Sequence, residues 1–308
     1  DLEGYSSVTV EVPETASEEK IVELNMVSGD QTILPEGDKL LDKVVVKKPE
    51  TLIAENIKDG INIGGVVGGL VTPTNKLPQV VDGSITELTA EDLEGATKLR
   101  NGMFSQYSSL TKVAIPGSVI SIGNEAFRSC SRLISITIPD SVTSIGSSAF
   151  SGCSRLTSVI IPNSVKTVGT NVFYQCGGLA NVVIGNGITA ISDNMFYICA
   201  ALTNITIGKS VTSIGNSAFF ACTILTNITI PDSVTSIGNG AFNSCEYLKS
   251  ITIPSNVTSI GGAALKIGNA DNKAIITMLP TTPPTVASST FTAEYLNKII
   301  VPNGTGET

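Results

Sequence analysis

Residues 136–156 read ITIPDSVTSIGSSAFSGCSRL, and close versions of this stretch recur along most of the chain. The recurrence is clearest in the cysteine column, whose members stand 23 residues apart: Cys130, Cys153, Cys176, Cys199, Cys222 and Cys245. A phenylalanine stands three residues before each cysteine and a leucine three residues after it. Phe104, Tyr107 and Leu110 extend the register backwards, which makes seven units. A fixed period of about 20 to 50 residues predicts a solenoid.

Each position of the unit has a physical interpretation. Apolar residues alternate with polar ones over residues 133–138, as in a short strand with one buried face. Pro139 ends this strand because proline has no N–H to donate to a ladder. The glycine column, represented by Gly146, predicts a turn with positive φ or close backbone contact. The pair Ala149 and Phe150 predicts a short helical turn whose phenylalanine fills the core.

A single 23-residue coil cannot bury its own apolar side chains, so neighbouring coils must stack strand on strand. The predicted fold is a solenoid with a parallel β-sheet on one face and irregular or short helical turns on the other. At about 4.8 Å between strands, seven coils would extend about 34 Å.

The repeats resemble the leucine-rich repeats of BspA type, also called treponemal type, which occur on the surfaces of many bacteria. The resemblance covers residues 100 to about 264 and rests on the stretch quoted above. Gly185 and Gly208 depart from the pattern by replacing the proline, and Ser192 by replacing the glycine. The last segment resembles the family's closing unit, in which Phe291 and residues 299–301 would cover the last coil. The resemblance implies adhesion to a host glycoprotein, to extracellular matrix or to another cell.

The charge divides the chain into two parts. Residues 1–94 hold 19 acidic and 7 basic side chains, whereas the remainder holds 8 acidic and 12 basic ones. Such a shift indicates a domain boundary. The predicted organisation is an acidic module at 1–72, a linker at 73–84, an N-terminal cap at 85–107, repeats at 108–264 and a C-terminal capping unit at 265–308.

The N-terminal module is predicted to be α+β and to contain two divergent 36-residue units. YSSVTVEVPET at residues 5–15 aligns with LDKVVVKKPET at residues 41–51. The second copy would form a strand over 44–48, a helix over 51–58 and another strand over 61–71. Residues 41–72 resemble segments of phage or prophage tail and fibre proteins.

Composition excludes several functions. The chain has no histidine, so a Ser-His-Asp triad, a Cys-His dyad and a His-ligated metal site are impossible. A net charge of −8 makes nucleic acid an unlikely partner. No apolar run approaches the roughly 20 residues that span a bilayer. The acidic start has no signal-peptide pattern, so we expect that any export signal was removed or never present. No cofactor is expected.

The cysteines have two interpretations. Parallel side chains in neighbouring coils favour a buried ladder of six reduced, structural thiols. Pairing of adjacent rungs in an oxidising compartment is the alternative. No CxxC pair exists, so a metal site or redox motif has little support.

Two surfaces are candidates for binding. The outward strand positions carry small uncharged groups, with Ile160 and Val183 among them, and the polar candidates are Ser135, Thr137, Ser158, Asn181, Asn204, Thr206, Asn227, Thr229, Ser250 and Thr252. This face has none of the Trp, Tyr or Arg anchors typical of a hot spot, so it would bind weakly and multivalently. The other candidate is a variable exterior beside the phenylalanine and cysteine columns, formed by Arg128, Arg132, Arg155, Tyr174, Tyr197, Phe220 and Tyr247.

Taken together, these patterns predict a non-catalytic, extracellular or cell-surface binding protein whose partner is a protein or glycoprotein. The carboxylates of the repeats stand in different units, so no pair is forced together for acid-base chemistry: Glu125, Asp140, Asp193, Asp232 and Glu246. One alternative is a phage or prophage tail component anchored by residues 1–72. The other is a structural spacer. The sequence leaves the oligomeric state open.

Overall fold

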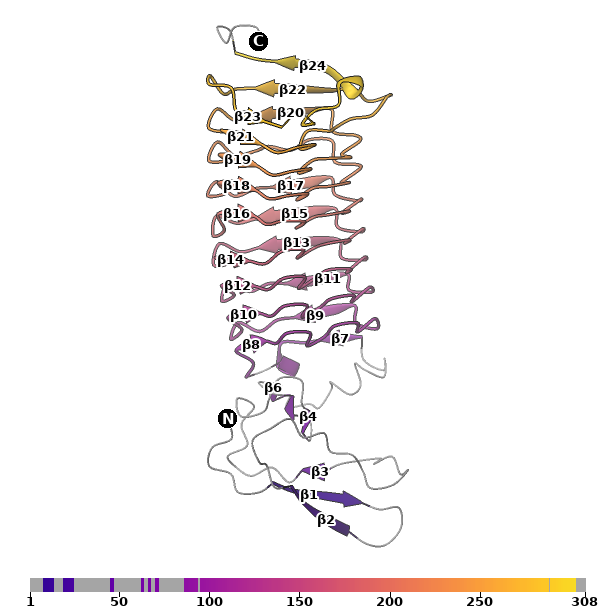
Figure 1. Ribbon diagram of the computed structural model, residues 1–308. Helices are drawn as coiled ribbons and strands as arrows, with labels where there is room; N and C mark the ends of the chain where they lie inside the picture. Colours follow the sequence, from indigo (N-terminus) through magenta and orange to yellow (C-terminus); the bar gives the residue numbers. More distant parts are fainter. Residues whose placement is uncertain are drawn as a thin grey trace.

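The computed structural model describes residues 8–13, 19–24, 45–46, 62–63, 66–67, 70–71, 86–93, 95–287 and 289–302. The described residues from 86 onward wind as a β-solenoid whose coils stack along one axis (Figure 1). The 3-10 turns η2 (Glu91–Leu93) and η3 (Ala293–Tyr295) are the helical elements of this part. The predicted solenoid is therefore confirmed.

The N-terminal region contributes two small antiparallel sheets. β1 (Val8–Pro13) pairs with β2 (Glu19–Leu24) and with β3 (Val45–Val46). Val10 faces Val46, its counterpart 36 residues later. β4 (Asn62–Ile63), β5 (Val66–Val67) and β6 (Leu70–Val71) form a meander where one strand was predicted. The predicted helix over 51–58 and the linker at 73–84 lie outside the described residues, so the α+β module stays a prediction.

The first face of the solenoid is built from the predicted strands, which pair in parallel with a register of one repeat (Figure 1). One sheet has six strands, β7 (Glu87–Leu88), β9 (Lys112–Ala114), β11 (Ser135–Thr137), β13 (Ser158–Ile161), β15 (Asn181–Ile184) and β17 (Asn204–Thr206). A second sheet has three, β20 (Ser250–Ile253), β22 (Ala274–Met278) and β24 (Leu296–Ile300). Buried and exposed residues alternate along strands such as β13 and β20, and the buried ones are apolar, as the alternation predicted. β24 is an exception, because its residues after Leu296 are exposed.

The second face is a further parallel β surface, which the sequence analysis did not predict. Its strands are two residues long and occupy the position that Ser144 and Ile145 hold in their coil. One sheet contains β8 (Lys98–Leu99), β10 (Ser121–Ile122), β12 (Ser144–Ile145) and β14 (Thr167–Val168). The other contains β16 (Ala190–Ile191), β18 (Ser213–Ile214), β19 (Ser236–Ile237), β21 (Ser259–Ile260) and β23 (Thr285–Val286). The expectation of a sheet on one side alone was wrong.

The third side of each coil, called here the turn edge, runs from the glycine to the leucine, as in residues 146–156. In the described repeats these stretches are non-helical turns. The prediction of a short helical turn was therefore wrong. Ser148 and Gly152 have positive φ values of 56° and 74°. This conformation directs alternate N–H groups at the next coil, so Phe150 N donates to Val172 O at 2.9 Å. In an α-helix these groups would have bonded within their own segment.

The glycine column is explained by close backbone contact and not by positive φ. A Cβ at Gly146 would lie 2.4 Å from Asn124 N, and one at Gly169 would lie 2.3 Å from Ser147 N. Neither glycine has a positive φ. Of the two reasons predicted for this glycine column, close backbone contact is confirmed and positive φ is wrong. A side chain at these positions would meet the backbone of the preceding coil.

Ser192 replaces this glycine in one coil, and the second face divides there. β14 and β16 belong to separate sheets, whereas β16 and β18 pair in parallel. The Cβ of Ser192 occupies space that the backbone of the preceding coil fills where this position is a glycine. Ser192 Oγ donates instead to Gly169 O at 2.6 Å, so a side-chain bond links the two coils.

The core contains a continuous stack of phenylalanine rings, one from each unit. Successive ring centroids are 5.1–5.6 Å apart and their planes lie within 15° of each other. All are fully buried: Phe104, Phe127, Phe150, Phe173, Phe196, Phe219 and Phe242. The prediction that phenylalanine fills the core is confirmed.

The stack extends beyond the predicted repeats at its C-terminal end. β7 and β8 supply the two strands of the first unit, that of Phe104, and β22, β23 and β24 continue both faces after the last repeat. Phe291 packs against the core and bridges Leu265. Ile299 pairs with Ile276, but its side chain is 41% exposed and that of Val301 is 53% exposed. Residues 299–301 thus meet the last coil mainly through their backbone.

Candidate functional site

The first face displays the polar row that the strand alternation predicted. All of its polar candidates are exposed: Ser135, Thr137, Ser158, Asn181, Asn204, Thr206, Asn227, Thr229, Ser250 and Thr252. Strand pairing sets equivalent residues side by side, and Asn204 Nδ2 donates to Asn181 Oδ1 at 2.9 Å. Ile160 and Val183 add apolar surface, at 63% and 42% exposure. Along β11, β13, β15 and β17 this face offers hydrogen bonds and apolar contact without charge.

The polar row of the first face is continuous as a surface, although the strands that carry it belong to two separate sheets. Residues 226–231, which continue the sequence pattern of this face between β17 and β20, form no strand. Asn227 and Thr229 nevertheless remain exposed, and Ile228 and Ile230 remain buried. Outward side chains therefore continue in order from one sheet to the next.

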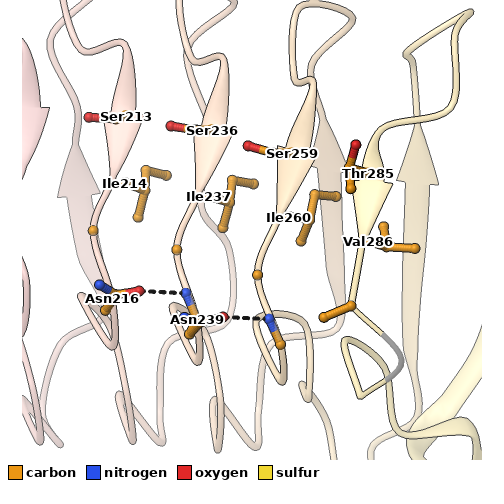
Figure 2. A pocket seen from close by; sticks show the side chains of 15 residues that line it. Ser213, Ile214, Asn216, Ser236, Ile237, Asn239, Ser259, Ile260, Thr285 and Val286 are labelled. Atoms are coloured by element: carbon orange, nitrogen blue, oxygen red, sulfur yellow. Dashed lines mark hydrogen bonds between the residues drawn. The ribbon is translucent and has the colours of Figure 1, made fainter.

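The second face carries a shallow groove that the sequence analysis missed. It runs along β18, β19, β21 and β23 and has a volume of about 470 Å³. Figure 2 shows the hydroxyls of Ser213, Ser236 and Ser259 in a row, beside the isoleucines that follow them. The repeated Ser-Ile-Gly triplet was the available signal, but a two-residue strand is too short to show a period.

A ladder of asparagine side chains forms part of the lining of this groove. Asn216 Oδ1 accepts the N–H of Asn239 at 2.9 Å, and Asn239 Oδ1 accepts the N–H of Gly262 at 2.7 Å (Figure 2). These side chains join successive coils. Their oxygens accept hydrogen bonds within the fold, so the polar groups that the groove can offer include the serine hydroxyls and that of Thr285.

The turn edge gathers the aromatic candidates into a second, exterior stack. Tyr174 and Tyr197 stack at 4.8 Å with planes 5° apart, and Tyr197 and Phe220 at 4.7 Å with planes 8° apart. The three side chains are half-buried, whereas Tyr247 is 46% exposed. Rings stacked face to face present mainly their edges, so this stack stabilises the contact between successive coils.

The basic candidates lie on the turn edge of the coils before this stack. Arg128 Nη1 pairs with Glu125 Oε2 at 3.1 Å, and both side chains are about half exposed. Such a pair contributes little to stability. Arg132 and Arg155 are exposed and occupy the same position of adjacent coils. The two arginines thus lie on the same side of the solenoid, one coil apart.

The cysteines form the buried ladder that was predicted. All six are free and buried. Each Sγ donates to the carbonyl of the phenylalanine 26 residues earlier, at 2.9 Å from Cys130 to Phe104 and 3.1 Å from Cys176 to Phe150. Burial raises the pKa of Cys130 and Cys176 to about 12. A thiol that stays protonated is a poor nucleophile and metal ligand, so this column is structural.

The carboxylates of the repeats do not assemble a centre. Within the described ranges, no group of three or more His, Cys, Asp or Glu residues could hold a metal ion. Asp193 Oδ1 accepts the N–H of Asn216 at 2.6 Å and so belongs to the side-chain ladder of the second face. In the same part of the chain, no helix has the length and apolarity to cross a membrane.

Comparison with known proteins identifies one family. The model of the BspA type leucine rich repeat region, found in six copies, matches residues 97–225 and 213–307. A leucine rich cell surface protein from Faecalibacterium prausnitzii A2-165 is 28% identical, with a TM-score of 0.51 over 67% of this chain and 65% of that one.

Two further solved structures share the repeat. A leucine-rich repeat protein from Bacteroides ovatus is 26% identical, with a TM-score of 0.49 over 62% of this chain and 57% of that one. The leucine rich repeat protein of T. pallidum is 29% identical, with a TM-score of 0.36 over 42% and 72%. The chain therefore spans less than two thirds of the first two relatives. None of the curated proteins matches it.

Proposed function

Because the chain belongs to the BspA-type leucine-rich repeat family, we propose that it is a non-catalytic binding protein at a cell surface or outside the cell. The solenoid would mediate adhesion by holding a protein or glycoprotein partner. The similar protein from F. prausnitzii, which is described as a cell surface protein, supports this location.

The observation that carries the proposal is that each coil combines buried residues that are nearly constant with exposed residues that vary. The phenylalanine, cysteine and leucine columns are buried and nearly constant from coil to coil. The outward positions of the first face are exposed and change between Ser, Asn, Thr, Ile and Val. A rigid framework that presents a varied surface is suited to recognition, and repeat proteins use their extended surfaces in this way.

We place the partner on the first face. This face is flat and uncharged along β11, β13, β15 and β17, with Ile160 and Val183 providing apolar contact among hydrogen-bonding side chains. Many small contacts at fixed spacing favour a partner that engages several coils at once. Substitutions at the centre of the polar row should therefore weaken binding more than substitutions at its edge.

The test is binding of the full chain to immobilised laminin, fibronectin and collagen by biolayer interferometry. The double variant Asn181→Arg with Asn204→Arg places two guanidinium groups at the centre of the first face. The matched control is Thr170→Arg with Gln175→Arg, which adds the same charge at exposed positions of the turn edge. We expect binding by the wild type and the control, and a loss of about tenfold or more in the first-face variant.

Two results would contradict the proposal. Equal affinity of both variants would remove the first face as the binding surface, and a loss confined to the control would move it to the turn edge. If the folded wild type binds none of the three matrix proteins and no cultured host cell, the adhesion role fails.

A further inference from the structure

The first face loses its main-chain hydrogen bonds at one coil, while the coils on either side of it keep theirs. In the six-stranded sheet the bonds run from each coil to the one before it, and the last of this series joins Thr203 N to Ala180 O at 3.1 Å. Within the described residues, the equivalent amides of Thr226 and Lys249 make no such bond. The series resumes where Ile275 N donates to Lys249 O at 2.9 Å. The coil of Thr226 is therefore unpaired on both of its sides in this face.

This interruption, called here the gap, covers residues 226–231. Its first five residues read T-N-I-T-I, and the same five residues at 203–207 contain β17, which pairs with β15. Strand propensity and alternation are thus equal in the two coils, so the residues of the gap are able to pair. The side chains differ in the same way. Asn204 Nδ2 reaches Asn181 Oδ1 of the preceding coil at 2.9 Å, whereas Asn227 Nδ2 donates within its own coil.

The other two sides of the solenoid stay joined at the coil that carries the gap. On the second face, Thr235 N donates to Thr212 O at 2.8 Å. On the turn edge, Phe219 N donates to Ala241 O at 2.8 Å, and the ring of Phe219 stacks on that of Phe242 at 5.3 Å. Because these coils are held on two sides and open on the third, they can pivot about the sides that are held.

The core is more exposed beside the gap than on either side of it. Ile205 of β17 is only partly buried, and Ile228 in the gap is 9% exposed. In the same inward column, Val182 before the gap and Ile251 after it are 2% and 1% exposed. The exposure thus agrees with the missing hydrogen bonds in placing an opening on the first face.

We propose that residues 226–231 are a hinge, about which the coils after the gap tilt as one block and so open and close the first face. The block before the hinge is held by the six-stranded sheet, and the block after it by the sheet of β20, β22 and β24. In the closed arrangement the gap pairs with both neighbours. Hinge motions of this kind are concentrated in a few residues between rigid elements and occur in microseconds to milliseconds.

The hinge crosses the polar row of the first face. A partner that contacts both Asn204 and Ser250 spans the gap, so it would bind one arrangement of the hinge more tightly and increase its population. This consequence rests on the proposed function, whereas the hinge itself does not.

The experiment measures distances between pairs of nitroxide labels on the full chain by pulsed electron resonance. Ser135→Cys with Ser250→Cys places the labels five coils apart across the gap, and Glu87→Cys with Asn204→Cys places them five coils apart within the six-stranded sheet. All four positions are exposed. The backbones of each pair are about 24 Å apart at about 4.8 Å per coil. We expect the distribution of distances across the gap to be roughly twice as wide as that within the sheet.

A third pair of labels tests where the pivot lies. Ala190→Cys with Thr285→Cys crosses the same coils on the second face, where β16, β18, β19, β21 and β23 pair without interruption. We expect this distribution to be as narrow as that of the six-stranded sheet, because the held side moves little. The native cysteines are buried, so the unsubstituted chain serves as the control for labelling and should take up no nitroxide.

Hydrogen exchange followed by NMR tests the gap itself. Thr203 and Thr226 both stand between a leucine and an asparagine, so their amides have the same intrinsic exchange rate. The Thr203 amide donates to Ala180 O and the Thr226 amide has no equivalent bond, so we expect Thr226 to exchange about tenfold or more faster. The Thr235 amide, which is bonded across the second face, should exchange as slowly as that of Thr203.

Three results would overturn the hinge. Equal widths of the two first-face distributions would show that the coils are rigid across the gap. A second-face distribution as wide as that across the gap would mean that these coils loosen as a whole and do not pivot. Equal exchange rates of Thr203 and Thr226 would show that the gap is closed in solution. These measurements contain no partner, so a failure of matrix binding leaves them unchanged, and the two proposals can fail separately.

Discussion

Single residues hold this solenoid together by reaching from one coil to the next. The cysteine column shows why a particular residue type recurs. The site is too small for a large side chain, and each thiol donates to a phenylalanine carbonyl of the preceding coil, as Cys199 does to Phe173 at 3.2 Å. Alanine would fit the space but would leave that buried carbonyl with one donor fewer.

The thiols make a pH-dependent contribution to stability whose sign is fixed by burial. Below about pH 8 they are protonated in both the folded and the unfolded chain. Burial raises the pKa of Cys176 to about 12 in the folded chain, whereas an unfolded thiol titrates near 8.5. Between these values the unfolded chain releases protons that the folded chain keeps, so stability falls as the pH rises.

We therefore expect Cys176→Ala to be less stable than the wild type at pH 7 but to lose less stability between pH 8 and pH 10. The difference in that loss should be about 2 kcal/mol for one thiol. Urea denaturation at each pH measures it, and lysine and tyrosine titrations are common to both proteins. An identical decline in the two proteins would contradict the burial of this thiol.

The glycine column supplies a second prediction for a single residue. Gly146→Ala would place a Cβ 2.4 Å from Asn124 N and force two coils apart, so we expect destabilisation of about 1–3 kcal/mol. Gly117→Ala is the matched control because its Cβ would meet nothing within 4 Å and its φ is not positive. Thermal unfolding followed by circular dichroism compares the two. If Gly117→Ala were as unstable as Gly146→Ala, the close contact with the preceding coil would not be the reason why position 146 requires glycine.

At the scale of elements, each coil contributes hydrogen bonds to its neighbours on all three sides. The first and second faces do so through parallel strands, and the turn edge does so through N–H groups that point at the next coil. The strands of the first face were predictable because four or five alternating residues show a period. The two-residue strands of the second face were not, because their pairing depends on the position of a neighbour 23 residues away.

The division of the second face at Ser192 gives a prediction for this element. The equivalent amides of Gly169 and Gly215 donate across the ladder at 2.9 and 2.8 Å, while β14 and β16 do not pair. Hydrogen exchange followed by NMR should therefore find the Ser192 amide about tenfold or more faster than those two glycine amides.

The variant Ser192→Gly provides the control. It removes the Cβ that separates the coils, so the amide at position 192 should become protected to the level of its neighbours. Continued fast exchange in this variant would mean that the side chain does not cause the division.

For the whole molecule, stability is a sum of coils and of contacts between adjacent coils. The stacked phenylalanines run through every repeat, so the loss of a central ring affects two interfaces at once. We expect Phe173→Ala, which empties a fully buried site, to cost about 3–5 kcal/mol. Asn204→Ala on the exposed first face should change stability by less than about 0.5 kcal/mol. Equal melting temperatures of these two variants would reverse the assignment of inside and outside.

The candidate surfaces were predictable to different degrees. The polar row of the first face follows from the strand alternation, since residues such as Asn181 must face outward when Val182 faces inward. The aromatic residues of the turn edge were recognised as exterior, but their mutual stacking was not. The stacking of Tyr174 on Tyr197 depends on the contact between two coils, and these residues are 23 positions apart in the sequence.

The sequence by itself determined the period, the parallel stacking, the buried phenylalanine, cysteine and leucine columns, and the outward side of the first face. These follow from patterns within one coil, repeated often enough to exclude chance. The tertiary structure decided the second face, the positive φ of the turns, the reason for the glycines and the division at Ser192. Each of these depends on distances between backbones of adjacent coils, such as the 2.4 Å between a Cβ at Gly146 and Asn124 N, and such distances exist only once the coils are stacked.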